Sequence, residues 1–168
     1  FSFIYPLPYY ISAVFSYIIG SMWAIKVLTL LSYIAGGLGM YRLLCANGKG
    51  IATFAALIYL LTPYQFLNIF VRGALGEILA LALIPWVLTS FNSLFSKNTS
   101  QLRWYHPIPL ALLLSAHNFL GILFAVFLLG YILIHKPKLK LGLASLLLSF
   151  SLAAYFLLPM IFERNLLY

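Results

Sequence analysis

The sequence predicts an all-α protein, a polytopic transmembrane helical bundle. Hydrophobic residues make up 64% of its 168 residues and charged residues only 7%, against about 25% charged residues in an average soluble domain. A soluble core of this size has no room for so much apolar surface, so the expected solvent is lipid. Several apolar runs approach the length of about 20 residues that a membrane-spanning helix needs.

The net charge of +8 follows the pattern of a membrane protein. Most of the cations lie in three clusters between apolar runs, as cytoplasmic loops do under the positive-inside rule. A nucleic-acid-binding domain would instead carry a continuous basic face, so we expect no nucleic-acid partner. The three clusters are Arg42 with Lys49, Lys97 with Arg103, and Lys136 with Lys138 and Lys140.

The two ends of the chain carry no targeting signal and no polar tail. The first residue is Phe1, and the last residues are apolar, which predicts a fragment of a larger protein. We expect one transmembrane domain over residues 1–168, with a juxtamembrane segment at 1–22 and the helical bundle at 23–168. Pro6 and Pro8 suit the start of a helix in the juxtamembrane segment, because proline is tolerated in a first helical turn.

Four apolar segments predict membrane spans. Pro63 and Pro85 fall inside two of them and predict kinks, because proline removes a backbone hydrogen bond. Thr62 is placed to satisfy a freed carbonyl beside Pro63. The last span is expected to end at Pro159. The segments are residues 23–44, 51–71, 78–95 and 141–159.

Residues 105–134 allow two interpretations. They could form one long tilted helix, or two short segments that meet at a break near His117. With the Arg42–Lys49 loop in the cytoplasm, only a chain that turns back near His117 places all three basic clusters on the same side. We therefore favour the turn, which gives five or six membrane segments in total and places Arg72, Glu77 and His117 on the outer face.

Arg72 and Glu77 are the main candidates for a functional site. Ionisable side chains are costly near lipid and are functional candidates by default. Gly73 and Gly76 make a bend between them easy, so the two side chains could pair or point at one ligand. The arginine fork suits phosphate or carboxylate oxygens, and a helix start near Gly76 would also favour an anion. The alternative is an ion pair that only closes a loop.

Other polar residues extend this list of candidate sites. Tyr64 lies on the polar side of the last turns before Arg72, and Asn118 follows His117 at the predicted break. His117 could shuttle protons or bond a backbone carbonyl that the break leaves free. Glu163 and Arg164 form a secondary candidate, or an ordinary interfacial anchor. The histidines have no metal-ligand spacing, and no cofactor motif is evident.

Several of these residues occur in an order that resembles a known family. The sequence resembles bacterial membrane proteins described as 6-pyruvoyl-tetrahydropterin synthase-related, a name that implies no pterin chemistry. In layout these are similar to the GT-C glycosyltransferases. The residues that carry the resemblance are Pro6-Leu7-Pro8-Tyr9-Tyr10, Lys26, Gly39-Met40-Tyr41, Tyr59 with Pro63-Tyr64, Val71-Arg72-Gly73-Ala74-Leu75 with Glu77, Ala80 and Pro85, and Ser115 with His117-Asn118.

The resemblance implies a function and a location. A GT-C-like enzyme would move a sugar from a polyprenyl-phosphate donor to a cell-envelope acceptor, at the outer face of the bacterial cytoplasmic membrane. By this analogy Arg72 would hold the donor phosphate, and Glu77 and His117 would line the cleft. The catalytic acidic residue, and any divalent metal that it binds, would lie before Phe1.

Two other functions are consistent with the sequence. A transporter or flippase for a lipid-linked anion would use the kinked helices as moving parts, but the polar residues gather at one face instead of forming a path across the membrane. A non-catalytic scaffold subunit would use Arg72 and Glu77 only to fix the fold, and it would tolerate exchange of the two charges.

Overall fold

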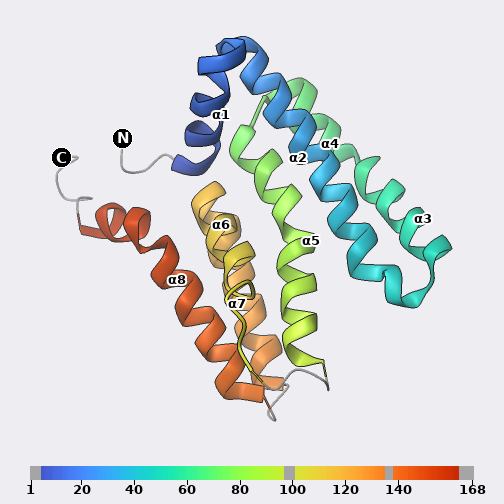
Figure 1. Ribbon diagram of the computed structural model, residues 1–168, viewed down its shortest axis with the longest axis vertical. Helices are drawn as coiled ribbons and strands as arrows, with labels where there is room; N and C mark the ends of the chain where they lie inside the picture. Colours follow the sequence, from blue (N-terminus) through green and yellow to red (C-terminus); the bar gives the residue numbers. More distant parts are fainter. Residues whose placement is uncertain (1–4, 97–100, 135–137, 163–168) are drawn as a thin grey trace. The chain divides into compact units, whose positions relative to one another are not determined.

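The computed structural model describes residues 5–96, 101–134 and 138–162 (Figure 1). Every regular element within these ranges is a helix, which confirms the all-α prediction. The helices are α1 (Pro6–Ile19), α2 (Ser21–Leu44), η1 (Cys45–Asn47), α3 (Lys49–Leu60), α4 (Pro63–Phe66), η2 (Leu67–Arg72), α5 (Leu75–Phe95), α6 (Ile108–Ala116), α7 (Asn118–Ile134) and α8 (Leu139–Phe162).

Three helices are long and apolar enough to cross a membrane, namely α2 with η1, α5 and α8. A fourth span arises if α3 and the segment Pro63–Arg72 are taken together, since they form a pair bent by 42°. The bend lies at Pro63, as the sequence predicts. The helices α1 and α7 are apolar but shorter. The described residues thus support three or four spans of the five or six that the sequence predicts.

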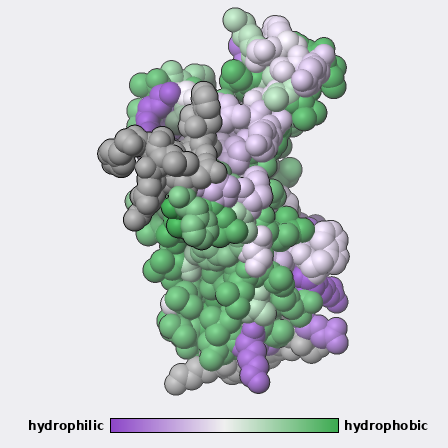
Figure 2. Space-filling view, turned by 90° about the vertical axis from the view of Figure 1, so that its left-hand side faces the viewer, coloured by the Kyte–Doolittle hydropathy of each residue, from purple (hydrophilic) through white to green (hydrophobic). Residues whose placement is uncertain are grey.

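The helices expose apolar side chains in the manner of lipid-facing surfaces. On α8, for example, Leu147 is 69% exposed and Tyr155 is 55% exposed. Figure 2 shows a broad hydrophobic area in its lower half, with hydrophilic side chains along the lower edge. A soluble protein rarely exposes contiguous apolar patches of this kind, so these surfaces fit the lipid environment that the composition predicts.

The chain divides into two compact units, of which the N-terminal unit spans Leu7–Thr89. Within it, α2 packs along α3. Close approach depends on Gly39 of α2, where an added Cβ would lie only 2.7 Å from Trp86 Nε1 of α5. The same indole nitrogen donates a 2.9 Å hydrogen bond to the carbonyl of Ala35. Small residues on α2 therefore let the backbone meet α5 closely, as in many membrane helix pairs.

The bend at Pro63 has its backbone carbonyls satisfied by neighbouring groups. In an unbroken helix the carbonyl of Tyr59 would accept from residue 63, which as proline has no N–H. The N–H of Thr62 donates to that carbonyl instead, at 3.4 Å. The next carbonyl, of Leu60, accepts a 2.9 Å hydrogen bond from the hydroxyl of Tyr33 on α2. The bend therefore leaves neither carbonyl unpaired in an apolar setting, where each would be costly.

The carbonyl that Pro85 leaves without a partner inside α5 accepts a hydrogen bond from another helix. The carbonyl of Leu81 loses its usual partner, since residue 85 has no N–H. The hydroxyl of Tyr59 on α3 donates to this carbonyl at 2.6 Å. One tyrosine thus supplies the hydrogen bond that the proline removes, and it connects α3 to α5 at the same time.

We expect Tyr59→Phe to destabilise the N-terminal unit by about 1–3 kcal/mol, the cost of an unsatisfied buried carbonyl. In a Pro85→Ala background residue 85 regains its N–H, so the same change should cost almost nothing. Urea unfolding of the four proteins in detergent forms a double-mutant cycle that measures this coupling. Equal costs in both backgrounds would contradict the assigned hydrogen bond.

The C-terminal unit comprises residues 1–6 and 90–168, as far as they are described. In it α6 ends at Ala116, His117 adopts an extended conformation, and α7 starts at Asn118. The two helices pack against each other, so the chain turns back at His117. This confirms the favoured interpretation of residues 105–134. With nine residues, α6 is short for a membrane segment, since 1.5 Å per residue gives a length of about 14 Å.

His106, which precedes α6, is buried against the last turns of α5. It is 1% exposed. Its Nδ1 accepts a 3.0 Å hydrogen bond from the backbone N–H of Arg103, and its Nε2 lies 3.2 Å from Ser93 Oγ. Ser90 donates to its carbonyl at 2.9 Å. Burial lowers the pKa of His106 below its usual 6.5, so the buried ring is held in the neutral form.

The two ends of α8 (Leu139–Phe162) differ in what lies beside them. Before its first turn, Lys138 donates to the carbonyls of Leu94 and Ser96 at the end of α5, where a cation is favoured by the helix dipole. At its other end, α8 does not stop at Pro159 as predicted but continues to Phe162. Proline removes one hydrogen bond and bends a helix without always ending it, and α8 bends near its C-terminal end (Figure 1).

Candidate functional site

The candidate site lies in the N-terminal unit, where η2 meets α5. Gly73 takes a left-handed conformation with φ of 57°, which a residue with a Cβ adopts only at a cost. The N–H of Ala74 then bonds back to the carbonyl of Asn68 at 3.2 Å. This tight turn reverses the chain between Arg72 and Glu77, so the bend predicted from the glycines is confirmed at Gly73.

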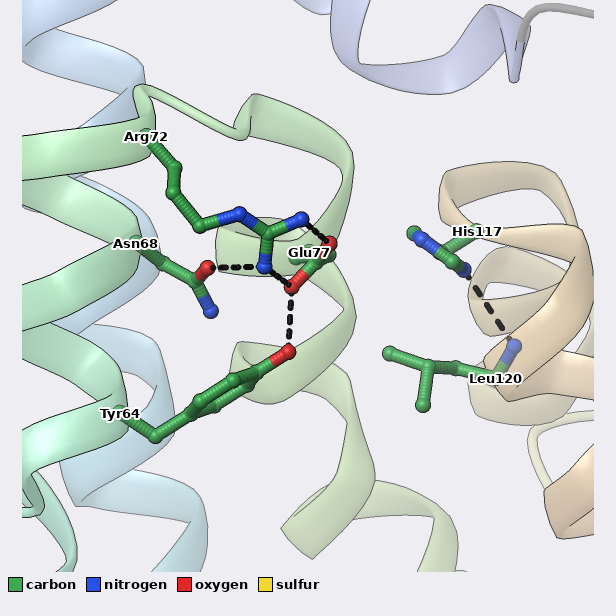
Figure 3. A network of polar contacts seen from close by, with 6 residues as sticks. All are labelled: Tyr64, Asn68, Arg72, Glu77, His117 and Leu120. Carbon is green, nitrogen blue, oxygen red and sulfur yellow. Dashed lines mark hydrogen bonds and ion pairs between the residues drawn. The ribbon is translucent and has the colours of Figure 1, made fainter.

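The turn brings Arg72 and Glu77 into a two-point ion pair (Figure 3). Arg72 Nη2 lies 2.6 Å from Glu77 Oε1, and Nη1 lies 2.8 Å from Oε2. Tyr64 also donates to Oε2 at 2.5 Å. Charge-assisted and bidentate contacts of this type are the strongest class of hydrogen bond in proteins. The orientation of the guanidinium is therefore fixed.

Asn68 is the fourth member of this network, and the sequence analysis did not select it. It is fully buried, and its Oδ1 accepts a 3.0 Å hydrogen bond from Arg72 Nη1. Its Nδ2 is a buried donor without a hydrogen-bond partner among the described residues. Asn68 lies four residues after Tyr64 and four residues before Arg72. This spacing places all three on one helix face, and it is the signal in the sequence that indicates a role for Asn68.

The segment that carries Tyr64, Asn68 and Arg72 changes its helix geometry along its length. The segment changes from the α-helix α4 to η2, a π-helix of six residues. A π-helix is wider than an α-helix and occurs frequently at functional sites. Residues at intervals of four lie close to one helix face, so Tyr64, Asn68 and Arg72 all reach the position of Glu77. Figure 3 shows the three side chains directed toward that carboxylate.

One edge of the Arg72 guanidinium takes no part in these contacts. The fork has five N–H donors, and the described hydrogen bonds use both donors of Nη1 and one of Nη2. The remaining two, on Nε and Nη2, form the second edge of the fork. The Arg72 side chain is 45% exposed, whereas that of Glu77 is 14% exposed. Two parallel donors on a partly exposed arginine side chain match an oxyanion.

His117 and Asn118 belong to the C-terminal unit and have contacts of their own there. His117 Nδ1 accepts a 3.3 Å hydrogen bond from the N–H of Leu120 in the first turn of α7. Its ring stacks on Tyr5 with centroids 4.5 Å apart. Asn118 Nδ2 lies 3.3 Å from the sulfur of Met160 on α8. The histidine thus accepts a backbone hydrogen bond at the break, in the first turn of α7.

The other candidate residues add no further site within the described ranges. Glu163 and Arg164 lie outside the residues that the structure describes. Among residues 5–96, 101–134 and 138–162, no three His, Cys, Asp or Glu side chains come together in a metal-binding group. Cys45 is an exposed thiol near the carbonyl of Arg42. The Arg72 network is therefore the strongest candidate site.

Comparison with known proteins identifies the family. A family model described as the 6-pyruvoyl-tetrahydropterin synthase related domain, a membrane protein, matches residues 1–166. Neither the curated proteins nor the solved structures give a significant match. The family match covers nearly the whole chain and agrees with the apolar helices described above. This chain belongs to the 6-pyruvoyl-tetrahydropterin synthase related family of membrane proteins.

Proposed function

We propose that this chain is the membrane-embedded part of a GT-C-like glycosyltransferase. It would move a sugar from a polyprenyl-phosphate donor to a cell-envelope acceptor, at the outer face of a bacterial cytoplasmic membrane. The observation that carries the proposal is the second edge of Arg72, which offers two N–H donors from a fixed guanidinium. Phosphate oxygens at the lipid–water boundary are the expected ligand of such an edge.

The chemistry assigns a clear task to Arg72. An acceptor oxygen attacks the anomeric carbon of the sugar, the bond to the carrier phosphate breaks, and its electron pair stays on the phosphate oxygen. Negative charge therefore grows on the phosphate in the transition state. A cation that is already oriented stabilises this charge without reorganisation, which is the usual source of large catalytic effects. Glu77, Tyr64 and Asn68 act as positioning residues for Arg72.

The general base of the reaction is proposed to lie outside this chain. Glu77 accepts from both Arg72 and Tyr64, so both of its carboxylate oxygens are already engaged by donors of the network. We place the base and any metal that it binds in a loop that precedes Phe1. The helix α1 and the α6–α7 hairpin would supply the membrane segments beyond the three or four spans.

The proposal is tested by sugar transfer in membranes that contain the full-length protein. The assay supplies a radiolabelled polyprenyl-phosphate sugar and measures the label that reaches envelope material, against membranes that lack the protein. We expect label to move only where the protein is present. A free sugar phosphate without the polyprenyl chain should be a poor donor.

Two other outcomes would replace the proposal. Movement of the labelled lipid across a liposome bilayer, without chemical transfer, would assign the protein to transport of a lipid-linked anion. Neither transfer nor transport, together with loss of a partner complex when the protein is absent, would support a scaffold subunit.

A further inference from the structure

A groove of about 610 Å³ lies within the N-terminal unit, in the usual size range of sites for small ligands. Three segments form it. Residues of α2 between Ile25 and Tyr33 provide one wall. Residues from the end of α4 through η2 to the turn at Gly73 provide the second, and Leu75 and Ile78 of α5 close it. Almost all of the lining is apolar, including the rings of Phe66 and Phe70. A groove of this composition fits a hydrocarbon chain.

One cation marks the end of the groove. Lys26 is the only charged residue among those that line it. It is exposed and lies 4.7 Å above the ring of Trp23. Lys26 comes five residues after the start of α2 at Ser21, so its long side chain can reach the lipid headgroups by snorkelling. The lining contains no carboxylate that would neutralise this charge.

The groove extends from this cation toward the membrane interior. Lys26 and Tyr33 both line it and are seven residues apart on α2, which corresponds to about 10 Å along a helix. Thr29 lies between them on the same wall. The groove thus has a charged end near the start of a candidate span and an apolar continuation along it. This is the arrangement of a lipid, with a headgroup at the interface and a chain directed inward.

We infer that the groove binds an anionic phospholipid of the bilayer, with one acyl chain between α2, η2 and α5 and its phosphate at Lys26. The hydrocarbon region contains no water to fill such a space, so a lipid chain is the available occupant. The uncompensated charge of Lys26 selects an anionic headgroup over a neutral one.

This lipid site is separate from the proposed sugar-donor site. Arg72 is not among the residues that line the groove, although the neighbouring Gly73 is. The charge of the groove is therefore Lys26 alone. A bilayer phospholipid bound here would hold η2 against α2 and α5, and through η2 it would support the position of Arg72. The inference does not depend on the transfer reaction, since lipid binding is measured without it.

The test is native mass spectrometry of the purified full-length protein in detergent. The probes are phosphatidylglycerol and phosphatidylcholine with identical acyl chains. We expect the anionic lipid to bind about fivefold more tightly, the factor for one cation at a membrane surface. Lys26→Gln should remove this preference. Lys49→Gln deletes the same charge at the start of α3, away from the groove, and should retain it.

A second variant tests the groove itself. Ile69→Trp adds a large side chain on the η2 wall and should weaken the binding of both lipids. Three outcomes would overturn the inference: equal binding of both lipids by the wild type, the same loss in Lys49→Gln as in Lys26→Gln, or binding of polyprenyl phosphate with no binding of phosphatidylglycerol. The last outcome would assign the groove to the donor lipid.

Discussion

Replacing Arg72 with glutamine is expected to lower sugar transfer by about 10²–10³-fold, the usual effect of losing a preorganised donor at a developing negative charge. Glutamine retains an amide donor but has no charge and no second edge. The transfer assay with labelled polyprenyl-phosphate sugar measures the effect. Arg42→Gln is the matched control, because Arg42 is an exposed arginine at the end of α2 and has no contact with the network described above.

The charge-swapped variant Arg72→Glu with Glu77→Arg separates a phosphate-binding role from a structural one. If the pair only closes the turn at Gly73, the swapped pair should restore both folding and function. If Arg72 binds phosphate, the swapped protein should fold, because an ion pair is still present, but transfer should remain lost. Folding is followed by urea unfolding in detergent. Full transfer by this variant would sink the role assigned to Arg72.

Gly121→Ala is expected to destabilise the C-terminal unit by about 1–3 kcal/mol, the usual cost of overpacking. An added Cβ at this position of α7 would lie 2.7 Å from Leu114 Cα and 3.0 Å from Leu114 N on α6. These are backbone atoms, so they can move only if the whole of α6 moves. The side chain itself is small, and the cost comes from separating the two helices of the hairpin.

Gly130→Ala on the same helix provides a control with the opposite sign. An added Cβ at Gly130 has no atom within 4 Å, so only the helix propensity changes. Alanine is favoured over glycine in a helix interior by roughly 0.5–1 kcal/mol, and Gly130→Ala should therefore stabilise the protein slightly. Thermal unfolding followed by circular dichroism in detergent compares the two variants. Equal shifts at both positions would contradict the close packing of α6 and α7.

The sequence predicts the helices well, because hydropathy and proline act locally. The apolar runs locate α2, α5 and α8, and Pro63 locates the bend after α3. The break at His117 is also visible, since polar residues interrupt an apolar run there and the basic clusters require a turn. The pair of Arg72 and Glu77 stands out because ionisable residues are rare in this chain. In each case a few neighbouring residues carry the information.

Features that depend on contact between helices could not be predicted in this way. The register of α3 against α5 decides that Tyr59 meets the carbonyl freed by Pro85, and no single segment contains that information. Asn68 bonds Arg72 on its own segment, but its place in the network depends on the turn that brings Glu77 back to Arg72. The burial of His106 depends on its contacts with Ser90 and Ser93 of α5, which lie more than ten residues earlier in the chain.

The tyrosine contacts at the two proline positions have a consequence for motion. A hinge needs backbone groups that can exchange partners at little cost. Here the hydroxyls of Tyr33 and Tyr59 hold the carbonyls of Leu60 and Leu81, and each opening would leave a carbonyl unpaired, at about 1–3 kcal/mol. The bend at Pro63 is then rigid and does not act as a hinge. A transporter that works by rocking needs a hinge, whereas an enzyme that holds Arg72 in place benefits from a rigid bend.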